Sequence, residues 1–157
     1  NTWWDENGQK WQEGTLKDGE KDGLWTYYSG IKGQKESIGT YKSGKKEGKW
    51  TFWDFMGIKS TGTYKDGKRD GKWTDWHANG QKKIEVAYKD GKEDGLFIGW
   101  FENGKKLVEG NYKDGKEDGK WTYWIKNGQK RIEETYKVGE LVSKKCWDKD
   151  GNEKGCN

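Results

Sequence analysis

Aromatic and alternating apolar residues recur along the chain with a period of about 24 residues, which marks a repeat architecture. Within each period, a short run alternates apolar and polar residues, as at Ile84, Val86 and Tyr88, and a β-strand places such residues on one face. The stretches 16–40, 41–63, 64–87, 88–111 and 112–135 align in one frame, with lengths of 25, 23, 24, 24 and 24 residues.

Five columns of residues stay in register through these units. The expected core is made of two columns: Trp25, Trp50, Trp73, Phe97 and Trp121 form one, and Tyr41, Tyr64, Tyr88, Tyr112 and Tyr136, headed by Leu16, form the other. A third column holds Trp4, Tyr28, Trp53, Trp76, Trp100, Trp124 and Trp147. The last two follow the tyrosines: Lys17, Lys42, Lys65, Lys89, Lys113 and Lys137, then Gly19, Gly44, Gly67, Gly91, Gly115 and Gly139.

Each unit has the composition of a β-hairpin. A β-rich run such as 72–76 leads into an Asn-Gly pair in several units (7–8, 79–80, 103–104 and 127–128), and Asn-Gly favours a tight turn because both residues tolerate positive φ. A second strand follows, and we expect a six-residue link such as 90–95 to return the chain. The sequence contains no proline that would interrupt a ladder. It therefore predicts an all-β fold: about seven antiparallel hairpins, roughly 14 short strands, in an elongated twisted open sheet or solenoid without helices.

The two ends depart from the pattern. We expect one array over residues 1–157, with an N-terminal partial hairpin at 1–15, five regular repeats at 16–139 and an atypical C-terminal cap hairpin at 140–157, because terminal repeats are usually caps. The sequence begins at Asn1 without a methionine, as a processed or trimmed chain would. No apolar window of about 18 residues exists, so we expect no transmembrane segment.

Composition first suggests disorder, since Leu, Ile, Val and Phe together supply only 20 of 157 residues. Aromatic residues make up 15% of the chain, including 12 Trp, and each buried Trp removes on the order of 200 Å² from water, so a fold is expected nonetheless. The net charge of +4 comes from 31 basic and 27 acidic residues. The lysine column is followed directly by Asp18, Asp66, Asp90 and Asp114, which argues against nucleic-acid or strong phospholipid binding.

The units at 64–87, 88–111 and 112–135, with their Y-K-D-G-K-x-D-G-K-W links, resemble MORN repeats, specifically the bacterial variant class, over about residues 3–142. The resemblance implies stacked β-hairpins and a non-catalytic scaffold or binding platform, with roles in self-association or membrane-lipid binding; bacterial members are often described as antitoxin components. The stretch 24–30 also resembles the short aromatic hairpins of Gram-positive cell-wall-binding repeats, but it lacks their G-x-M pattern.

The residues suggest no enzyme, cofactor or metal. His77 is the only histidine, next to a turn, and we interpret it as a solvent-side strand residue. The acidic residues recur identically in every unit, whereas an active site normally occurs once. The loop 148–155 differs from an EF-hand loop, which needs Gly at its sixth position and Glu at its twelfth.

Cys146 and Cys156 flank the last turn. A three-residue loop at 150–152 would place them directly opposite each other, within disulfide range. A disulfide favours an oxidising compartment, hence an extracellular or cell-surface location; free thiols would fit a cytoplasmic protein.

Aromatic residues on both faces of one sheet cannot all be buried within it. Trp73 and Trp76 are three residues apart and therefore face opposite sides. Either all the rings are core, or a strip remains to bind a partner; the candidates for that strip are Trp3, Trp4, Trp53, Trp76, Trp100, Trp124 and Trp147. We expect a non-enzymatic structural or protein-interaction module that self-associates head to tail into a fibre or surface assembly. The alternatives are a soluble antitoxin or immunity-type protein with one partner, and a carbohydrate or cell-wall binder.

Overall fold

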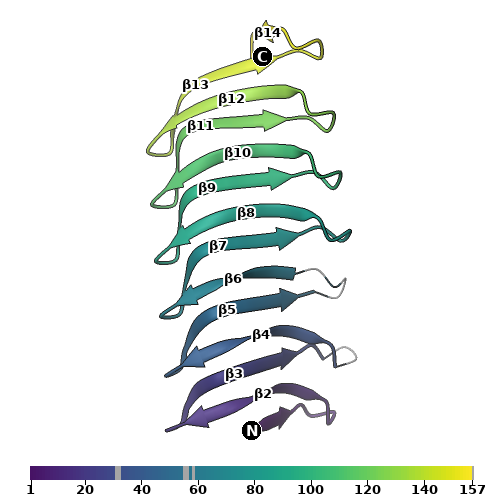
Figure 1. The fold of residues 1–157 in the computed structure, drawn as a ribbon, viewed down its shortest axis with the longest axis vertical. Coiled ribbons are helices and arrows are strands. Elements are labelled where there is room, and N and C mark those ends of the chain that lie inside the picture. The colour runs from purple at the N-terminus through teal and green to yellow at the C-terminus, as the bar shows by residue number, and fades with distance from the viewer. Residues whose placement is uncertain (31–32, 55–56, 58, 157) are drawn as a thin grey trace.

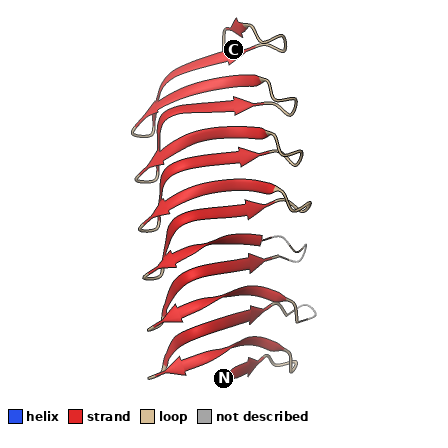
Figure 2. Ribbon diagram, viewed as in Figure 1, coloured by secondary structure: helices blue, strands red, loops and turns tan. Residues whose placement is uncertain are grey.

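A computed structural model describes the chain except for residues 31–32, 55–56, 58 and 157. It is one open 14-stranded antiparallel sheet in which the strands follow sequence order, so each strand pairs with the strands before and after it (Figures 1 and 2). This confirms the predicted all-β array of consecutive hairpins. The strands are β1 (Thr2–Trp4), β2 (Lys10–Lys17), β3 (Glu20–Tyr28), β4 (Lys35–Lys42), β5 (Lys45–Trp53), β6 (Lys59–Lys65), β7 (Lys68–Trp76), β8 (Lys82–Lys89), β9 (Lys92–Trp100), β10 (Lys106–Lys113), β11 (Lys116–Trp124), β12 (Lys130–Lys137), β13 (Glu140–Trp147) and β14 (Glu153–Lys154).

The six-residue links expected from the sequence are not loops, and that prediction was wrong. Asp90 and Gly91 alone form the turn between β8 and β9, both with positive φ (51° and 90°), as a tight two-residue hairpin turn requires. The rest of the supposed link belongs to β9, where Gly95 (φ 109°) lies at a break in the pairing register. The extra residues at such bulges bend a strand, and the long strands bend close to these turns (Figure 1).

The Asn-Gly turns also differ from the expectation. Of Asn79 and Gly80, only the glycine has positive φ (82°). The His77 amide donates to the Gln81 carbonyl (2.7 Å) and the Gly80 amide to the His77 carbonyl (2.9 Å), so three residues form the loop. The Asn79 side chain accepts from the Gln81 amide (3.0 Å) and donates to the Glu102 carbonyl of the next unit (2.7 Å). Asn103 likewise donates to the Lys126 carbonyl (3.1 Å), so these two asparagines tie neighbouring loops together.

The core lies on one face of the sheet, which we call the aromatic face and define by Trp25, Trp50, Trp73, Phe97 and Trp121. Trp25 and Trp50 have no exposed surface. Trp50 lies over Gly39 of the preceding strand: a Cβ built on Gly39 would be 2.1 Å from the Trp50 ring. The indole nitrogen of Trp50 donates to the Thr40 carbonyl (3.1 Å). The same glycine–tryptophan pairing recurs at Gly14, Gly62 and Gly110, beneath Trp25, Trp73 and Trp121. Glycine is needed here because the ring occupies the place of a side chain.

Candidate interaction surfaces

On the N-terminal half of the aromatic face, each tryptophan carries a cation from its own strand. The Nζ of Lys21 lies 4.1 Å from the ring centre of Trp25, and the Nζ of Lys46 lies 4.3 Å from that of Trp50. Arg69 and Trp73 repeat the arrangement at 4.2 Å. Such cation–π contacts stabilise by roughly 0.5–2 kcal/mol, depending on desolvation. Burial, together with the charges of Arg69 and Lys21, lowers the pKa of Lys46.

A second ring accompanies the first two of these tryptophans, whereas Asp75 holds the corresponding position after Trp73. Tyr27 and Phe52 follow two residues after Trp25 and Trp50, and the tyrosine column inserts edge-on between units. The ring centres of Tyr41 and Trp50 are 5.2 Å apart at 86°. Burial, with the hydrogen bond to Tyr27, raises the pKa of Tyr41 far above its ordinary value, so this hydroxyl stays neutral. The expected core columns thus form a continuous ladder of rings through the N-terminal units.

The ladder is interrupted at β9. Where β3, β5 and β7 carry a cation, a tryptophan and a second side chain, β9 carries Glu93, Phe97 and Gly99. Val86 of β8 replaces the usual glycine beneath the ring, and it pairs with Phe97. The bulkier Val86 and the smaller Phe97 compensate each other, and Val108 covers Gly99: a Cβ built on Gly99 would be 2.9 Å from the Val108 Cγ1.

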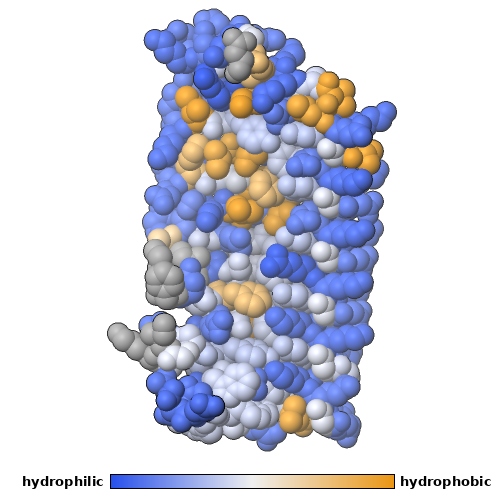
Figure 3. Space-filling view, turned by 180° about the vertical axis from the view of Figure 1, so that it is seen from behind, coloured by the Kyte–Doolittle hydropathy of each residue, from blue (hydrophilic) through white to orange (hydrophobic). Residues whose placement is uncertain are grey.

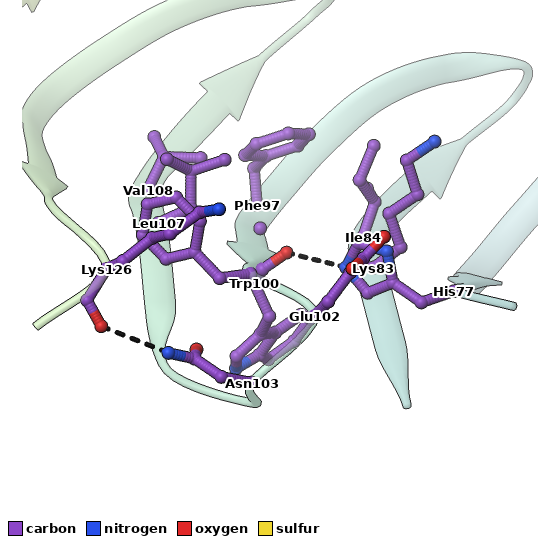
Figure 4. Close-up of a pocket in the computed structure, with 12 residues that line it drawn as sticks. His77, Lys83, Ile84, Phe97, Trp100, Glu102, Asn103, Leu107, Val108 and Lys126 are labelled. Carbon is purple, nitrogen blue, oxygen red and sulfur yellow. Dashed lines mark hydrogen bonds between the residues drawn. The ribbon is translucent and has the colours of Figure 1, made fainter. Parts of the chain in front are cut away.

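An apolar hollow of about 590 Å³ lies beside this unit on the aromatic face. Ile84 and Val108 flank Phe97 around it, and Leu107 lies next to Val108 (Figure 4). Apolar side chains gather over the C-terminal half of this face, whereas the N-terminal half is more polar (Figure 3). The reason is one column of the second strands, which reads Gln12, Ser37 and Ser60 in the first units and Ile84, Val108 and Ile132 in the later ones.

His77 lies at the rim of this hollow. Its Nε2 is 2.8 Å from the Trp100 carbonyl, and its side chain is half-buried. The interpretation of His77 as a solvent-side residue was therefore wrong, because its ring bridges two neighbouring loops. Among the described residues, no group of three or more His, Cys, Asp or Glu could hold a metal ion.

The opposite face carries the column Tyr28, Trp53, Trp76, Trp100, Trp124 and Trp147, all half-buried. Lysines of the neighbouring strands cover part of these rings: the Nζ of Lys130 lies 3.9 Å from the ring centre of Trp147, and Lys130 also pairs with Glu133 (3.2 Å). Lys82 and Glu85 repeat that ion pair at 2.7 Å. Such partly exposed rings offer contact area without forming an open apolar strip.

The two ends of the sheet are only partly covered. At the N-terminal end, β1 pairs with β2 from Lys10 to Glu13, and the backbones of Asn1 and Gly14 exchange two hydrogen bonds. Residues 15–17 of β2 therefore have no outer strand beside them among the described residues. Trp3 stacks on Trp25 with ring centres 5.0 Å apart, while Trp4 is 60% exposed.

At the C-terminal end, β14 pairs only with Cys146 and Trp147, which leaves the outer edge of residues 140–145 unpaired within the described chain. Leu141 and Val142 on this edge are 51% and 64% exposed. Glu140, Lys144 and Lys145 belong to the same edge. A strand with unpaired backbone groups is a template for another chain.

A disulfide joins Cys146 and Cys156, with Cα atoms 5.3 Å apart. The pairing agrees with the expectation, but the register does not: Cys146 pairs with Lys154, and Cys156 lies two residues beyond. The loop is formed by residues 149–151, since the Asp148 amide donates to the Asn152 carbonyl (2.9 Å).

Two features of these surfaces were missed in the sequence although it contains them. The glycines beneath the tryptophans form a column, Gly14, Gly39, Gly62 and Gly110, eleven residues before each ring. The cations form another, in which Lys21, Lys46 and Arg69 give way to Glu93 and Glu117. The change from positive to negative charge along that column already indicates in the sequence that the C-terminal units differ from the first three.

The sequence matches the model of a known family, the MORN repeat variant, over residues 1–18, 69–90, 93–114 and 117–137, which is more than half of the chain. A search of curated proteins gave no match. Among the described residues, no helix is long and apolar enough to cross a membrane.

Proposed function

Because the chain belongs to the MORN repeat variant family, whose modules are generally non-catalytic and typically bind proteins, we propose that it is a protein-interaction module that associates with copies of itself end to end. The unpaired edge of β13 at residues 140–145 carries this proposal. Natural sheets blunt their edges with proline or charge. This edge has charge at Glu140, Lys144 and Lys145 but exposes Leu141 and Val142 next to the turn.

The contact is head to tail. Residues 15–17, the unpaired part of β2, lie at the end of the strand that is next to a two-residue turn. The unpaired part of β13 also lies next to a two-residue turn. β2 and β13 run in opposite directions, so β2 of a second copy would continue the antiparallel order beyond β13. Contacts between unlike surfaces repeat without limit unless they close into a ring, so a fibre or larger assembly is the expected product.

Light scattering over a range of protein concentrations tests this contact. The wild-type chain is expected to grow past a dimer, and the double change Leu141→Lys, Val142→Lys is expected to leave a monomer, because charge on an edge strand opposes pairing. Leu24→Lys with Leu96→Lys is the matched control, since both leucines are exposed (61% and 44%) away from the ends. A monomer at every concentration contradicts self-association, and growth that stops at two copies contradicts the head-to-tail arrangement.

An extracellular or cell-surface location belongs to the same proposal, supported by the bond between Cys146 and Cys156. Protein from its native source, alkylated with and without prior reduction, should differ at these two cysteines alone. Free thiols in that material would instead favour a cytoplasmic antitoxin or immunity-type protein.

A further inference from the structure

Charged side chains form a column along the aromatic face, and their sign reverses once. Five strands, each following a two-residue turn, carry a charge at their second residue: Lys21, Lys46, Arg69, Glu93 and Glu117. Each is paired in register with the strand before it, opposite Leu16 in the first unit and opposite the tyrosine column in the others. Because the sheet continues without a break (Figure 1), these five residues form one charge strip of three cations followed by two carboxylates.

The charges of this strip are not neutralised within the part of the chain that the structure describes. None of the five residues forms an ion pair there. Where the sign changes, Arg69 and Glu93 are linked only through the Tyr88 hydroxyl, which accepts a hydrogen bond from Arg69 (3.1 Å) and donates one to Glu93 (3.2 Å). The strip therefore has charge to offer to a partner.

Like charges also lie next to one another in both halves of the strip. Burial, followed by the charges of the neighbouring cations, lowers the pKa of Lys46. Burial, followed by the charges of the two carboxylates, raises the pKa of Tyr112. A partner with acidic groups over the first half and basic groups over the second would relieve this repulsion, so the strip favours a segment that carries both signs in that order.

The spacing of the strip indicates the conformation of such a segment. Successive charges are two strands apart, which is about 9.6 Å. A polyproline II helix turns once in three residues and rises about 9.3 Å in that turn, so every third side chain would stay opposite a charge, with a drift of only about 1 Å over the whole strip. Seven residues of an α-helix span about 10.5 Å, which accumulates a drift of about 4 Å. In a β-strand, residues three apart face opposite sides.

The surroundings of the strip are of the kind that polyproline II segments contact. The tyrosines paired with the charges are half-buried, so each leaves part of its ring accessible: Tyr41, Tyr64, Tyr88 and Tyr112. Proline-rich segments dock in aromatic-lined grooves, and their conformation is already ordered before binding, which lowers the entropic cost.

We propose that the charge strip binds a polyproline II segment of a partner protein in which every third residue is charged, three acidic side chains being followed by two basic ones. The acidic side chains lie over Lys21, Lys46 and Arg69, and the basic ones over Glu93 and Glu117. The strip lies on the face of the sheet rather than at its edges, so this proposal stands whether or not the chain associates with itself.

Fluorescence anisotropy of a labelled peptide at low ionic strength tests the proposal. The peptide Glu-Pro-Pro-Glu-Pro-Pro-Glu-Pro-Pro-Lys-Pro-Pro-Lys has the proposed spacing and should bind. Its isomer Glu-Pro-Glu-Pro-Glu-Pro-Lys-Pro-Lys-Pro-Pro-Pro-Pro has the same residues with charges two apart. It should bind at least about fivefold more weakly, because its charges cannot all lie opposite the strip at once.

Glu117→Lys is the decisive variant. The change is compatible with the fold, because Lys46 precedes Trp50 by the same number of residues as Glu117 precedes Trp121. It should weaken binding of the first peptide about fivefold, since an attraction becomes a repulsion. The same peptide with glutamate as its last residue should bind this variant as well as the first peptide binds the wild type, within about twofold.

Glu6→Lys is the matched control, because Glu6 is exposed in the loop between β1 and β2 and the change in net charge is the same. It should leave binding of the first peptide unaltered. Equal binding of the two isomers, equal weakening by Glu117→Lys and Glu6→Lys, or failure of the altered peptide to restore binding would overturn the proposal. So would the absence of binding to the wild-type protein.

Discussion

Exchanging the residues of one glycine–tryptophan pair for those of the fourth unit tests how the units hold their core. The changes are Gly39→Val and Trp50→Phe, alone and together, which reproduce Val86 and Phe97 at another position. A Cβ on Gly39 would lie 2.1–2.5 Å from three atoms of the Trp50 ring, closer than any real contact. The ring cannot move away easily, because Tyr41 and Phe52 pack against it at 5.2 and 5.8 Å.

The expected magnitudes follow from these contacts. Gly39→Val forces overpacking, which costs roughly 3 kcal/mol of unfolding free energy. Trp50→Phe removes the bond from the indole nitrogen to the Thr40 carbonyl, about 1 kcal/mol, and part of a fully buried ring, for a total of about 2–3 kcal/mol. In the double variant the smaller ring makes room for valine, so the loss should be about 2–3 kcal/mol rather than the sum of about 5–6.

Urea unfolding of the four proteins measures this cycle, with the m-value as a check on two-state behaviour. The coupling should be at least about 2 kcal/mol. Gly39→Val combined with Trp73→Phe serves as the control, because Trp73 lies over Gly62 instead, and this pair should be additive. Additivity within about 0.5 kcal/mol for Gly39 and Trp50 would refute the packing argument.

Three further changes probe the turns, the cap and the charges. Val138 holds a turn position with φ 54°, where a β-branched residue is strained. Val138→Asp should therefore raise the unfolding free energy, measured by thermal melts, by about 1 kcal/mol, and the reciprocal change Asp114→Val should lower it by about as much. If neither change had an effect, the backbone at Val138 would not be strained. The double change Cys146→Ser, Cys156→Ser should lower the unfolding free energy by roughly 2–3 kcal/mol on the chain-entropy model, as measured by urea unfolding. The reduced wild-type protein should show the same loss. Burial acts to raise the pKa of Glu134, but hydrogen bonds from neighbouring side chains, above all Lys144, outweigh it and hold this pKa below 4.5. The ionised Glu134 therefore stabilises the fold above pH 4.5, and this stabilisation is lost as the pH falls through the pKa of the folded state. Glu134→Gln should make the unfolding free energy depend less steeply on pH in the acid range, and an unchanged dependence would show that Glu134 does not contribute.

The order and number of the hairpins could be predicted because the spacing of aromatic columns fixes both. The turns could not, since Asn79-Gly80 and Asp90-Gly91 are both good hairpin signals and only the three-dimensional register decides which one is tight. The sheet places the two-residue turn at Asp-Gly because the strand continues through Gly95 as a bulge. A glycine inside a strand is a recognised sign of a bulge, and this reading would have corrected the six-residue link.

The candidate hollow was beyond sequence reasoning for a different reason. Aligning the repeats shows the residues that recur, such as Trp73 and Trp121, and Phe97 then looks like a conservative replacement. The walls of the hollow come from three strands, β8, β9 and β10, and Val108 of one strand covers Gly99 of the next. Which absences leave space depends on what the neighbouring strands place opposite, and that is known only once Val108 is paired with Gly99.

Departures from the repeat are of two kinds: paired changes of side-chain volume, and changes of charge. Val86 and Phe97 change volume in opposite directions at paired positions, so the core stays filled and the exchange needs no functional explanation. Gly99 is compensated in the same way, because the larger side chains of Ile84 and Val108 are paired with it where the first units carry Gln12, Ser37 and Ser60. Glu93 is of the second kind: with Glu117 it reverses the charge that Lys21, Lys46 and Arg69 place at this position, and the Tyr88 hydroxyl donates a hydrogen bond to it (3.2 Å). A change of charge leaves the packing of the rings intact, so it alters what this part of the face attracts without lowering the filling of the core.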